Sequence, residues 1–257
     1  MKRWLRLGMC CWIWMAGAIC WADDALITVP TRDGQKIAYW WMPKEGAKAT
    51  VILLSGGSGG IGVKDGLPRS NNFLIRSREL FRNEGFNVAL LGNPSDMRDM
   101  DDAWRTSAAH RTDVQNVMAD IRRQSSAPLW LVGTSRGTIS ATALALALQD
   151  QLAGVVLTAS ITSYREAAAV PRQAIGQLRL PVLIYHHRQD ACHITQAAEA
   201  GNILSGLTQA RVKKLMIVEG GQNPTGNPCQ SLHWHGFVGM EERAVQDIAA
   251  WVRDPQP

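Results

Sequence analysis

The sequence predicts an α/β fold in which a mostly parallel central sheet carries helices on both faces. Two observations lead to this prediction. Short segments rich in Val, Ile and Leu alternate along the chain with longer helical segments. Apolar strands that alternate with helices are typical of a parallel sheet that is covered on both faces. No internal repeat, low-complexity tract or linker interrupts the sequence after residue 22, so we expect one domain over residues 23–257.

The first strands are expected to differ from the later ones. Residues 25–31 and 36–41 are predicted to be two strands joined by a turn at Asp33 and Gly34, as an antiparallel lead-in. Residues 50–54 are predicted to be the first buried strand. The later elements are, in order, a helix over 71–83, a strand over 87–91, a helix over 103–123, a strand over 129–132, a helix over 136–148, a strand over 154–158, a partly helical stretch over 165–177, a strand over 182–185, a helix over 195–204, a strand over 212–218 and a last helix.

The last helix has the clearest pattern. Phe237, Met240, Ala244, Ile248 and Trp251 recur at spacings of three and four residues, which places them on one face of a helix. We expect this helix to pack on the sheet and to close the domain.

The start of the chain has the composition of a secretory signal peptide. Lys2, Arg3 and Arg6 precede an uncharged run over residues 7–21. A basic start, a short apolar stretch and small residues before the cut are typical of such a signal, so cleavage is predicted after Ala22. The uncharged run is shorter than the roughly 20 residues that span a bilayer. We therefore expect residues 1–22 to be removed, no stable membrane anchor to remain, and the mature protein to be periplasmic or secreted.

Removal of this segment changes the charge and the cysteine count. The formal net charge falls from +5 to +2, because three basic residues leave with the signal. So small a positive charge does not favour a nucleic-acid partner. Cys192 and Cys229 are the only cysteines that remain, and an even number in an oxidising compartment predicts one disulfide. The alternative is two buried thiols that never meet.

A nucleophile motif follows the predicted strand over 129–132. The strand runs into Gly133, Thr134, Ser135, Arg136 and Gly137, and an Ala- and Leu-rich helical segment follows at once. G-x-S-x-G between a strand and a helix is typical of a tight turn that exposes a strained nucleophilic serine. The alternative is an ordinary strand-to-helix turn. The placement of the motif predicts that Ser135 is the nucleophile.

With this motif the chain resembles the α/β-hydrolase superfamily, and the resemblance covers nearly all of the sequence after residue 22. It implies a serine, an acid and a histidine in this order along the chain. Asp190 follows the predicted strand over 182–185, where the superfamily keeps its acid, and Glu219 is the reserve candidate. His235 precedes the last helix in a His-Gly-Phe sequence, and His233 is the alternative base.

The resemblance also implies a role for each residue. His235 would take the proton of the Ser135 hydroxyl, and Asp190 would orient the imidazole and stabilise its cation. The oxyanion would be held by the backbone amide of Arg136 and by one from the Gly-rich loop over 55–60, with Gly57 as the first choice and Ser58 as the second. Ser55 stands where many members have histidine, which leaves the donor in this loop open. A bridge between the predicted cysteines would join the acid loop to the histidine loop.

Two rival interpretations concern cofactors. Residues 57–62 match G-x-G-x-x-G after a strand, but Asn93 stands where a dinucleotide site would have an acid, and no Gly-Lys-Ser/Thr follows as a P-loop requires. His186, His187, Asp190, Cys192, His193, His233 and His235 could form a metal cluster, yet no pair has a recognised zinc spacing. We therefore expect neither a metal nor an organic cofactor. His110 is interpreted as a packing residue.

These observations predict hydrolysis of an ester or related acyl bond of a small-molecule substrate through an acyl-serine intermediate. The interval between the strands at 154 and 182 is too short for a large helical lid, so an open site is expected, with residues 56–70 and 94–104 as its walls. A serine peptidase on the same fold and a non-catalytic binding protein that retains the fold are the alternatives.

Overall fold

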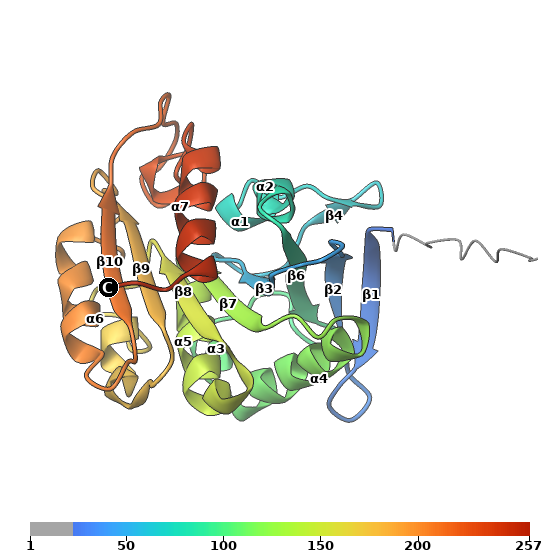
Figure 1. Ribbon diagram of the computed structural model, residues 1–257. Helices are drawn as coiled ribbons and strands as arrows, with labels where there is room; N and C mark the ends of the chain where they lie inside the picture. Colours follow the sequence, from blue (N-terminus) through green and yellow to red (C-terminus); the bar gives the residue numbers. More distant parts are fainter. Residues whose placement is uncertain (1–22) are drawn as a thin grey trace, which may run out of the picture.

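The structure is a computed structural model, and it describes residues 23–257 (Figure 1). The predicted signal peptide, residues 1–22, lies outside the described residues and stays a prediction. The main sheet has eight strands in the order β1-β2-β6-β3-β7-β8-β9-β10. These strands are β1 (Ala25–Pro30), β2 (Lys36–Met42), β3 (Ala49–Leu54), β6 (Phe86–Pro94), β7 (Leu129–Thr134), β8 (Gly154–Thr158), β9 (Val182–His187) and β10 (Lys213–Val218).

The sheet is antiparallel at one edge and parallel over the rest. β1 pairs antiparallel with β2, and β2 pairs antiparallel with β6. The other pairs of this sheet are all parallel. Leu54 of β3 is paired with Gly133 of β7, so the loops that follow these two strands start side by side. The predicted fold class is confirmed, including its antiparallel lead-in.

The helices cover both faces of this sheet. They are α1 (Phe73–Arg76), α2 (Arg78–Asn83), α3 (Asp102–Arg105), α4 (Ala108–Gln124), α5 (Gly137–Leu148), α6 (Ala200–Gly206) and α7 (Glu241–Arg253). Apolar residues of α4, α5 and α6 share one hydrophobic core, and those of α1, α2 and α7 share the other. The structure therefore has the expected three layers.

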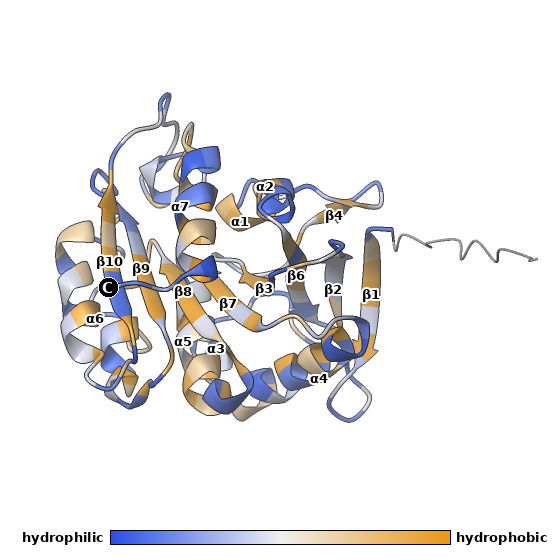
Figure 2. Cartoon of the chain, viewed as in Figure 1, coloured by the Kyte–Doolittle hydropathy of each residue, from blue (hydrophilic) through white to orange (hydrophobic). Residues whose placement is uncertain are grey.

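The central strands are buried on both faces. In β7, Leu131 packs in the core under α4 and α5, whereas its neighbour Trp130 packs in the core under α7. Figure 2 shows hydrophobic residues along the strands and hydrophilic stretches on the helices. Trp130 meets Trp251 of α7 with ring centroids 5.8 Å apart. A Cβ on Gly154 of the next strand would lie 2.2 Å from the Trp130 ring, so only glycine leaves room for this contact.

Several predicted elements have different bounds in the structure. The expected helix over 103–123 is divided into α3 and α4, because Ser107 caps α4 by accepting a hydrogen bond from the His110 amide. The helix over 71–83 is divided at Ser77. The stretch over 165–177 contains only two short 3₁₀ turns, Val170–Arg172 and Ile175–Gln177.

The last helix begins later than its pattern predicts. Phe237 has a φ of 58° and Gly239 one of 73°, and a run of right-handed helix cannot include either conformation. The helix α7 therefore starts at Glu241. Phe237 nevertheless packs in the same core as α7. Its predicted burial is therefore correct, and its predicted place in the helix is wrong.

Between residues 23 and 257 the structure has no large lid domain, as the sequence predicted. Residues 159–181, which connect β8 to β9, contain only the two 3₁₀ turns. The loop over 56–70 contains one small hairpin of β4 (Val63–Lys64) and β5 (Leu67–Pro68). Between residues 23 and 257, no helix combines the length and the apolar character that a membrane span requires.

Candidate active site

Ser135 lies on a sharp turn between β7 and α5. Its φ is 53°, a left-handed conformation that costs a residue with a side chain roughly 1 to 3 kcal/mol. The turn is held by hydrogen bonds from the Ser135 amide to the Thr158 carbonyl and from the Thr138 amide to the Ser135 carbonyl, at 3.1 and 2.8 Å. Local strain of this kind is typical of functional sites.

The two motif glycines are required by close backbone contacts. A Cβ on Gly133 would lie 2.6 Å from the Gly137 carbonyl oxygen, and a Cβ on Gly137 would lie 2.0 Å from that of Leu54. Both distances are shorter than any real Cβ contact, so a larger residue would displace the turn. The G-x-S-x-G motif thus exists because β3, β7 and α5 meet here without room for side chains.

A cavity of about 230 Å³, which we call the nucleophile cavity, contains both predicted reacting side chains. Ser135 and His235 line it, together with Gly56, Gly57, Asn72, Phe73, Thr134, Cys229, Gln230, Ser231 and Gly236. No hydrogen bond joins the Ser135 hydroxyl to the His235 imidazole within residues 23–257. Such bonds are often long before substrate binds, and they tighten in the complex.

The carboxylate of Asp190 lies against the imidazole of His235. Oδ2 of Asp190 is 3.0 Å from Nδ1 of His235, and both side chains are almost fully buried. Oδ1 accepts a hydrogen bond from the Cys192 amide at 3.0 Å. Because Nδ1 is held by the carboxylate, Nε2 is the nitrogen left for proton transfer. The structure therefore brings the predicted acid and base together.

A threonine that the sequence analysis did not single out belongs to this group. The hydroxyl of Thr195 donates to Oδ2 of Asp190 at 2.9 Å and is 3.1 Å from Nδ1 of His235. The side chain of Thr195 is fully buried. Its hydroxyl fixes the relative position of the carboxylate and the ring. No local signal in the sequence marks this residue, because only folding brings residues 195 and 235 together.

The reserve candidates lie elsewhere. Glu219 is exposed and pairs with Arg188, so it is not at the imidazole of His235. His233 is partly buried, its ring is packed edge-on against Trp234, and it does not line the nucleophile cavity. Asp190, and not Glu219, lies at the imidazole of His235. His235, and not His233, lines the nucleophile cavity.

His186 lies fully buried beneath the same loops. Its Nε2 accepts a hydrogen bond from the Ser160 amide at 2.9 Å. Burial lowers the pKa of His186 to about 4, and the nearby Asp190 carboxylate opposes this shift only in part. His186 is therefore neutral at neutral pH and serves as a hydrogen-bond acceptor in the core.

The loop after β3 lies directly against Ser135, the predicted nucleophile. A Cβ on Gly56 would be 2.8 Å from the Cβ of Ser135, and Gly57 adopts a φ of 57° at the wall of the cavity. The backbone amides of Gly57 and Arg136 make no hydrogen bond within the described part of the chain. Free amides beside a nucleophile are the kind of donor that an oxyanion requires. Gly57 and Arg136 stay our predicted donors.

This loop is held by a buried arginine. Arg105 is 1% exposed, and its Nη2 donates to the Gly57 carbonyl at 3.0 Å, its Nε to the Met100 carbonyl at 2.9 Å and its Nη1 to Ser140 Oγ at 3.1 Å. The contacts are with carbonyls and a hydroxyl, and none is with a carboxylate. Burial lowers the pKa of Arg105 to about 10, so the group remains charged at neutral pH.

The contact with the Gly57 carbonyl connects Arg105 to the candidate site. By holding the Gly57 carbonyl, the guanidinium fixes the peptide planes of the loop that faces Ser135. Nothing in the sequence around Arg105 marks this role, because an arginine on a short helix is an ordinary feature.

The predicted disulfide between Cys192 and Cys229 is present, with the two Cα atoms 4.5 Å apart. It joins the loop of Asp190 to the loop that precedes His235. Nδ1 of His193 lies 3.7 Å from the sulfur of Cys229. Within residues 23–257, these three residues are the one group that could hold a metal ion, but both sulfurs are occupied by the disulfide.

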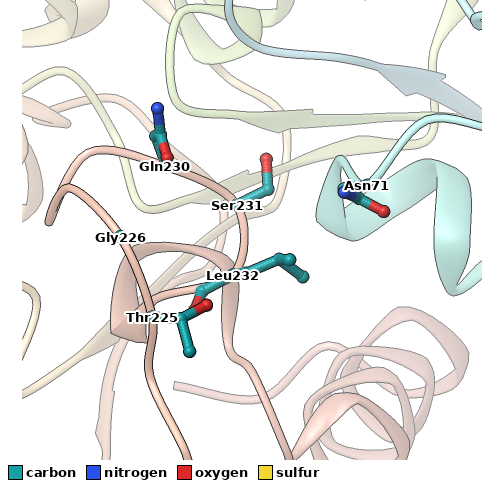
Figure 3. Close-up of a pocket in the computed structure, with 6 residues that line it drawn as sticks. All are labelled: Asn71, Thr225, Gly226, Gln230, Ser231 and Leu232. Atoms are coloured by element: carbon teal, nitrogen blue, oxygen red, sulfur yellow. The ribbon is translucent and has the colours of Figure 1, made fainter.

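A second cavity of about 260 Å³, which we call the side cavity, shares Gln230 and Ser231 with the nucleophile cavity. Figure 3 shows the residues that line the side cavity. It is lined by Asn71, Thr225, Gly226, Gln230, Ser231 and Leu232. Residues 56–70 and 94–104 were predicted to form the walls of the site, and this prediction is wrong for most of them. Of these residues, only Gly56 and Gly57 line either cavity. The loop over 225–232 and the start of α1 form the walls instead.

Comparison with known proteins supports the fold. No protein-family model matches the sequence, and no curated protein is similar to it in sequence at a significant level. An esterase of Pyrococcus furiosus is 12% identical, with a TM-score of 0.65 over 90% of each chain. A Xanthomonas campestris protein, described as an α/β serine hydrolase without a lid, is 16% identical over 90% of this chain and 92% of its own, with a TM-score of 0.59.

A cold-adapted esterase from an Arctic intertidal metagenomic library is also similar. It is 16% identical over 91% of this chain and 94% of its own, with a TM-score of 0.61. At such low identities the likeness concerns the fold. The chain therefore has the α/β-hydrolase fold, as its resemblance to that superfamily predicted.

Proposed function

We propose that this chain is an exported serine hydrolase that cleaves an ester or related acyl bond of a small molecule through an acyl-serine intermediate. One observation carries the proposal. Ser135, on a strained turn, shares a cavity with His235, whose Nδ1 is hydrogen-bonded to the buried carboxylate of Asp190. The esterase and serine-hydrolase descriptions of the similar structures support the same reaction class.

The geometry suggests the following steps. Nε2 of His235 removes the hydroxyl proton of Ser135, and the Ser135 oxygen attacks the carbonyl carbon of the substrate. The amides of Gly57 and Arg136 stabilise the negative charge that forms on the carbonyl oxygen. His235 then gives its proton to the departing alcohol. Water attacks the acyl-serine with His235 again as the base, which releases the acid and restores the serine.

Export is the second part of the proposal. It rests on the signal-like composition of residues 1–22 and on the disulfide between Cys192 and Cys229, which is typical of an oxidising compartment. We propose a periplasmic or secreted location. A mature protein whose first residue is Asp23, recovered from the periplasm or medium of expressing cells, would support this, and retention of Met1 in the cytoplasm would contradict it.

The central test compares Ser135→Ala with the wild type and with Ser205→Ala, which removes an exposed hydroxyl of α6. The wild type and Ser205→Ala should hydrolyse phenyl acetate and bind a fluorophosphonate covalently. Ser135→Ala should lose the covalent label and at least about 10³-fold in turnover while it stays folded. Undiminished turnover by Ser135→Ala would overturn the proposal.

Two further results of the same experiment would favour the alternatives. Faster cleavage of acetanilide than of phenyl acetate would indicate a serine peptidase. A folded wild-type protein that neither reacts with the fluorophosphonate nor turns over any ester or amide would indicate a non-catalytic binding protein.

A further inference from the structure

The side cavity borders the nucleophile cavity, with which it shares two lining residues. Gln230 and Ser231 line both, so a molecule whose carbonyl lies at Ser135 can extend past these two residues into the side cavity. Figure 3 shows the arrangement: Asn71, from the segment before α1, lies across from the loop that carries Thr225, Gln230 and Ser231. The side cavity is therefore placed to receive the part of a substrate that does not react.

One wall of the side cavity is a loop closed on itself. The amide of Thr225 donates to the Leu232 carbonyl at 2.7 Å, which joins the two ends of the loop over 225–232. The Cys229 amide donates to Oδ1 of Asn227 at 2.9 Å, and Cys229 is bound covalently to Cys192. A wall fixed in this way loses little conformational entropy when a ligand binds.

The opposite wall is held by an arginine. The guanidinium of Arg76 donates to the carbonyls of Asn71 and Gly236 and forms an ion pair with Glu241. It thereby ties the segment before α1 to the loop of His235. Because Arg76 is neutralised by Glu241, it fixes this wall without adding a free positive charge to the cavity.

The lining is uncharged and combines four polar side chains with the exposed apolar side chain of Leu232. Four of its side chains carry an amide or a hydroxyl, namely Asn71, Thr225, Gln230 and Ser231, and none of its residues is acidic or basic. The side-chain polar atoms of Asn71, Gln230 and Ser231 make no hydrogen bond within residues 23–257, whereas those of the neighbouring Asn72 cap α1. Three polar groups are thus free to bind a ligand.

We propose that the side cavity is a subsite for an uncharged, hydroxylated part of the substrate, as in an ester of a polyol. This inference rests on the proposed function. A hydroxyl is both a donor and an acceptor, so it can pair with either end of the amides of Asn71 and Gln230 and with Ser231. An alkyl group would displace water from these amides without replacing its hydrogen bonds. A charged group would find no opposite charge in the cavity.

The test uses pairs of esters that differ only in two hydroxyls. The pair 2,3-dihydroxypropyl acetate and propyl acetate places the hydroxyls on the alcohol part. The pair ethyl 3,4-dihydroxybutanoate and ethyl butanoate places them on the acyl part. The wild type should show a kcat/KM about tenfold higher for the hydroxylated member of one pair, which also identifies the part of the ester that enters the subsite. Acetylcholine, which carries a cation, should be a poorer substrate than 2,3-dihydroxypropyl acetate.

Two variants link the preference to the side cavity. Asn71→Leu keeps the size of the side chain and removes its amide, and it should reduce the preference for the hydroxylated ester to about twofold or less. Asn202→Leu makes the same change at an exposed position of α6, outside both cavities, and should keep the full preference.

The outcomes separate this inference from the proposed function. Hydrolysis that depends on Ser135 but shows no preference within either pair would overturn the subsite and leave the proposed function standing. A preference that survives in Asn71→Leu would also overturn it. Absence of all ester hydrolysis, or hydrolysis that persists in Ser135→Ala, would instead overturn the proposed function.

Discussion

The nucleophile side and the acid–base side of the candidate site are built in different ways. Around Ser135 the geometry is set by backbone contacts, since Gly56, Gly133 and Gly137 each lie too close to a neighbour to carry a side chain. Around His235 it is set by side chains, namely the carboxylate of Asp190, the hydroxyl of Thr195 and a disulfide. The first arrangement leaves a glycine motif in the sequence, and the second leaves no local pattern.

The two sides should therefore respond differently to mutation. The nucleophile side depends on tight packing of β3, β7 and α5, whose glycines no larger residue can replace without moving the backbone. The acid–base side depends on loops that follow β9 and β10 and are far apart in the sequence. Removal of one side-chain contact there should leave the rest of the fold intact. The following predictions test this contrast, from the largest expected effect to the smallest.

The largest effect is expected on the acid–base side. His235→Ala should reduce turnover by several orders of magnitude, because within residues 23–257 no other residue that lines the nucleophile cavity has a side chain that can act as a base. His233→Ala should keep most of the activity, since that ring does not line the nucleophile cavity. Steady-state kinetics with phenyl acetate would measure both. The opposite ranking would show that His233 is the base.

On the nucleophile side, Arg105→Met should lower kcat about 10- to 100-fold with little change in KM. The loss of the hydrogen bond to the Gly57 carbonyl would let the loop move, and an oxyanion donor acts mainly in the transition state. Arg105→Lys, which keeps the charge without the planar fork, should be intermediate. Circular dichroism of each variant controls for folding. An unchanged kcat in a folded Arg105→Met protein would remove the positioning role.

A smaller effect is expected from Thr195. Thr195→Val keeps the shape of the side chain and removes the hydroxyl that contacts Asp190 and His235, so kcat should fall about tenfold. Thr195→Ser keeps the hydroxyl and should restore most of the rate. If both variants lost activity equally, the packing of the methyl group would be responsible and not the hydrogen bonds.

The disulfide should affect the acid–base side before the rest of the fold. Its cysteines are 37 positions apart, and closing a loop of that size stabilises a protein by about 3 to 4 kcal/mol in the chain-entropy model. Reduction should lower activity at temperatures where circular dichroism still shows native structure, because the loops of Asp190 and His235 lose their link. Loss of activity and structure at the same temperature would contradict this, and two alkylated thiols in unreduced protein would exclude the bridge.

The last prediction concerns pH and His110, which lies beside Arg105. Both of its ring nitrogens are buried and have no hydrogen-bond partner among residues 23–257. Burial, and then the charge of Arg105, lower its pKa from 6.5 to about 3. Below pH 6.5 the unfolded chain takes up this proton and the folded protein does not. His110 therefore makes the free energy of unfolding fall as the pH drops toward 3, by about 2 kcal/mol at pH 5. Urea unfolding at pH 7 and pH 5 should show a smaller decrease for His110→Leu than for the wild type.

The sequence by itself determined the features that rest on local patterns. Apolar strands alternating with helices predicted the sheet, and G-x-S-x-G between a strand and a helix predicted the strained turn at Ser135. The resemblance to the α/β-hydrolase superfamily then implied Asp190 as the acid and His235 as the base. Element bounds were less exact, because the capping hydroxyl of Ser107 and the left-handed conformation of Phe237 act on single residues within otherwise helical patterns.

Only the tertiary structure decided what depends on contacts between distant segments. Thr195 meets His235, Arg105 meets the Gly57 carbonyl, and the loop over 225–232 faces Asn71 across the side cavity. None of these residues has an unusual local sequence, and each acquires its role from a partner at least 40 positions away. A hydrogen bond needs two groups within about 3 Å, and sequence distance carries no information on that separation until the strands have paired and the loops between them have met.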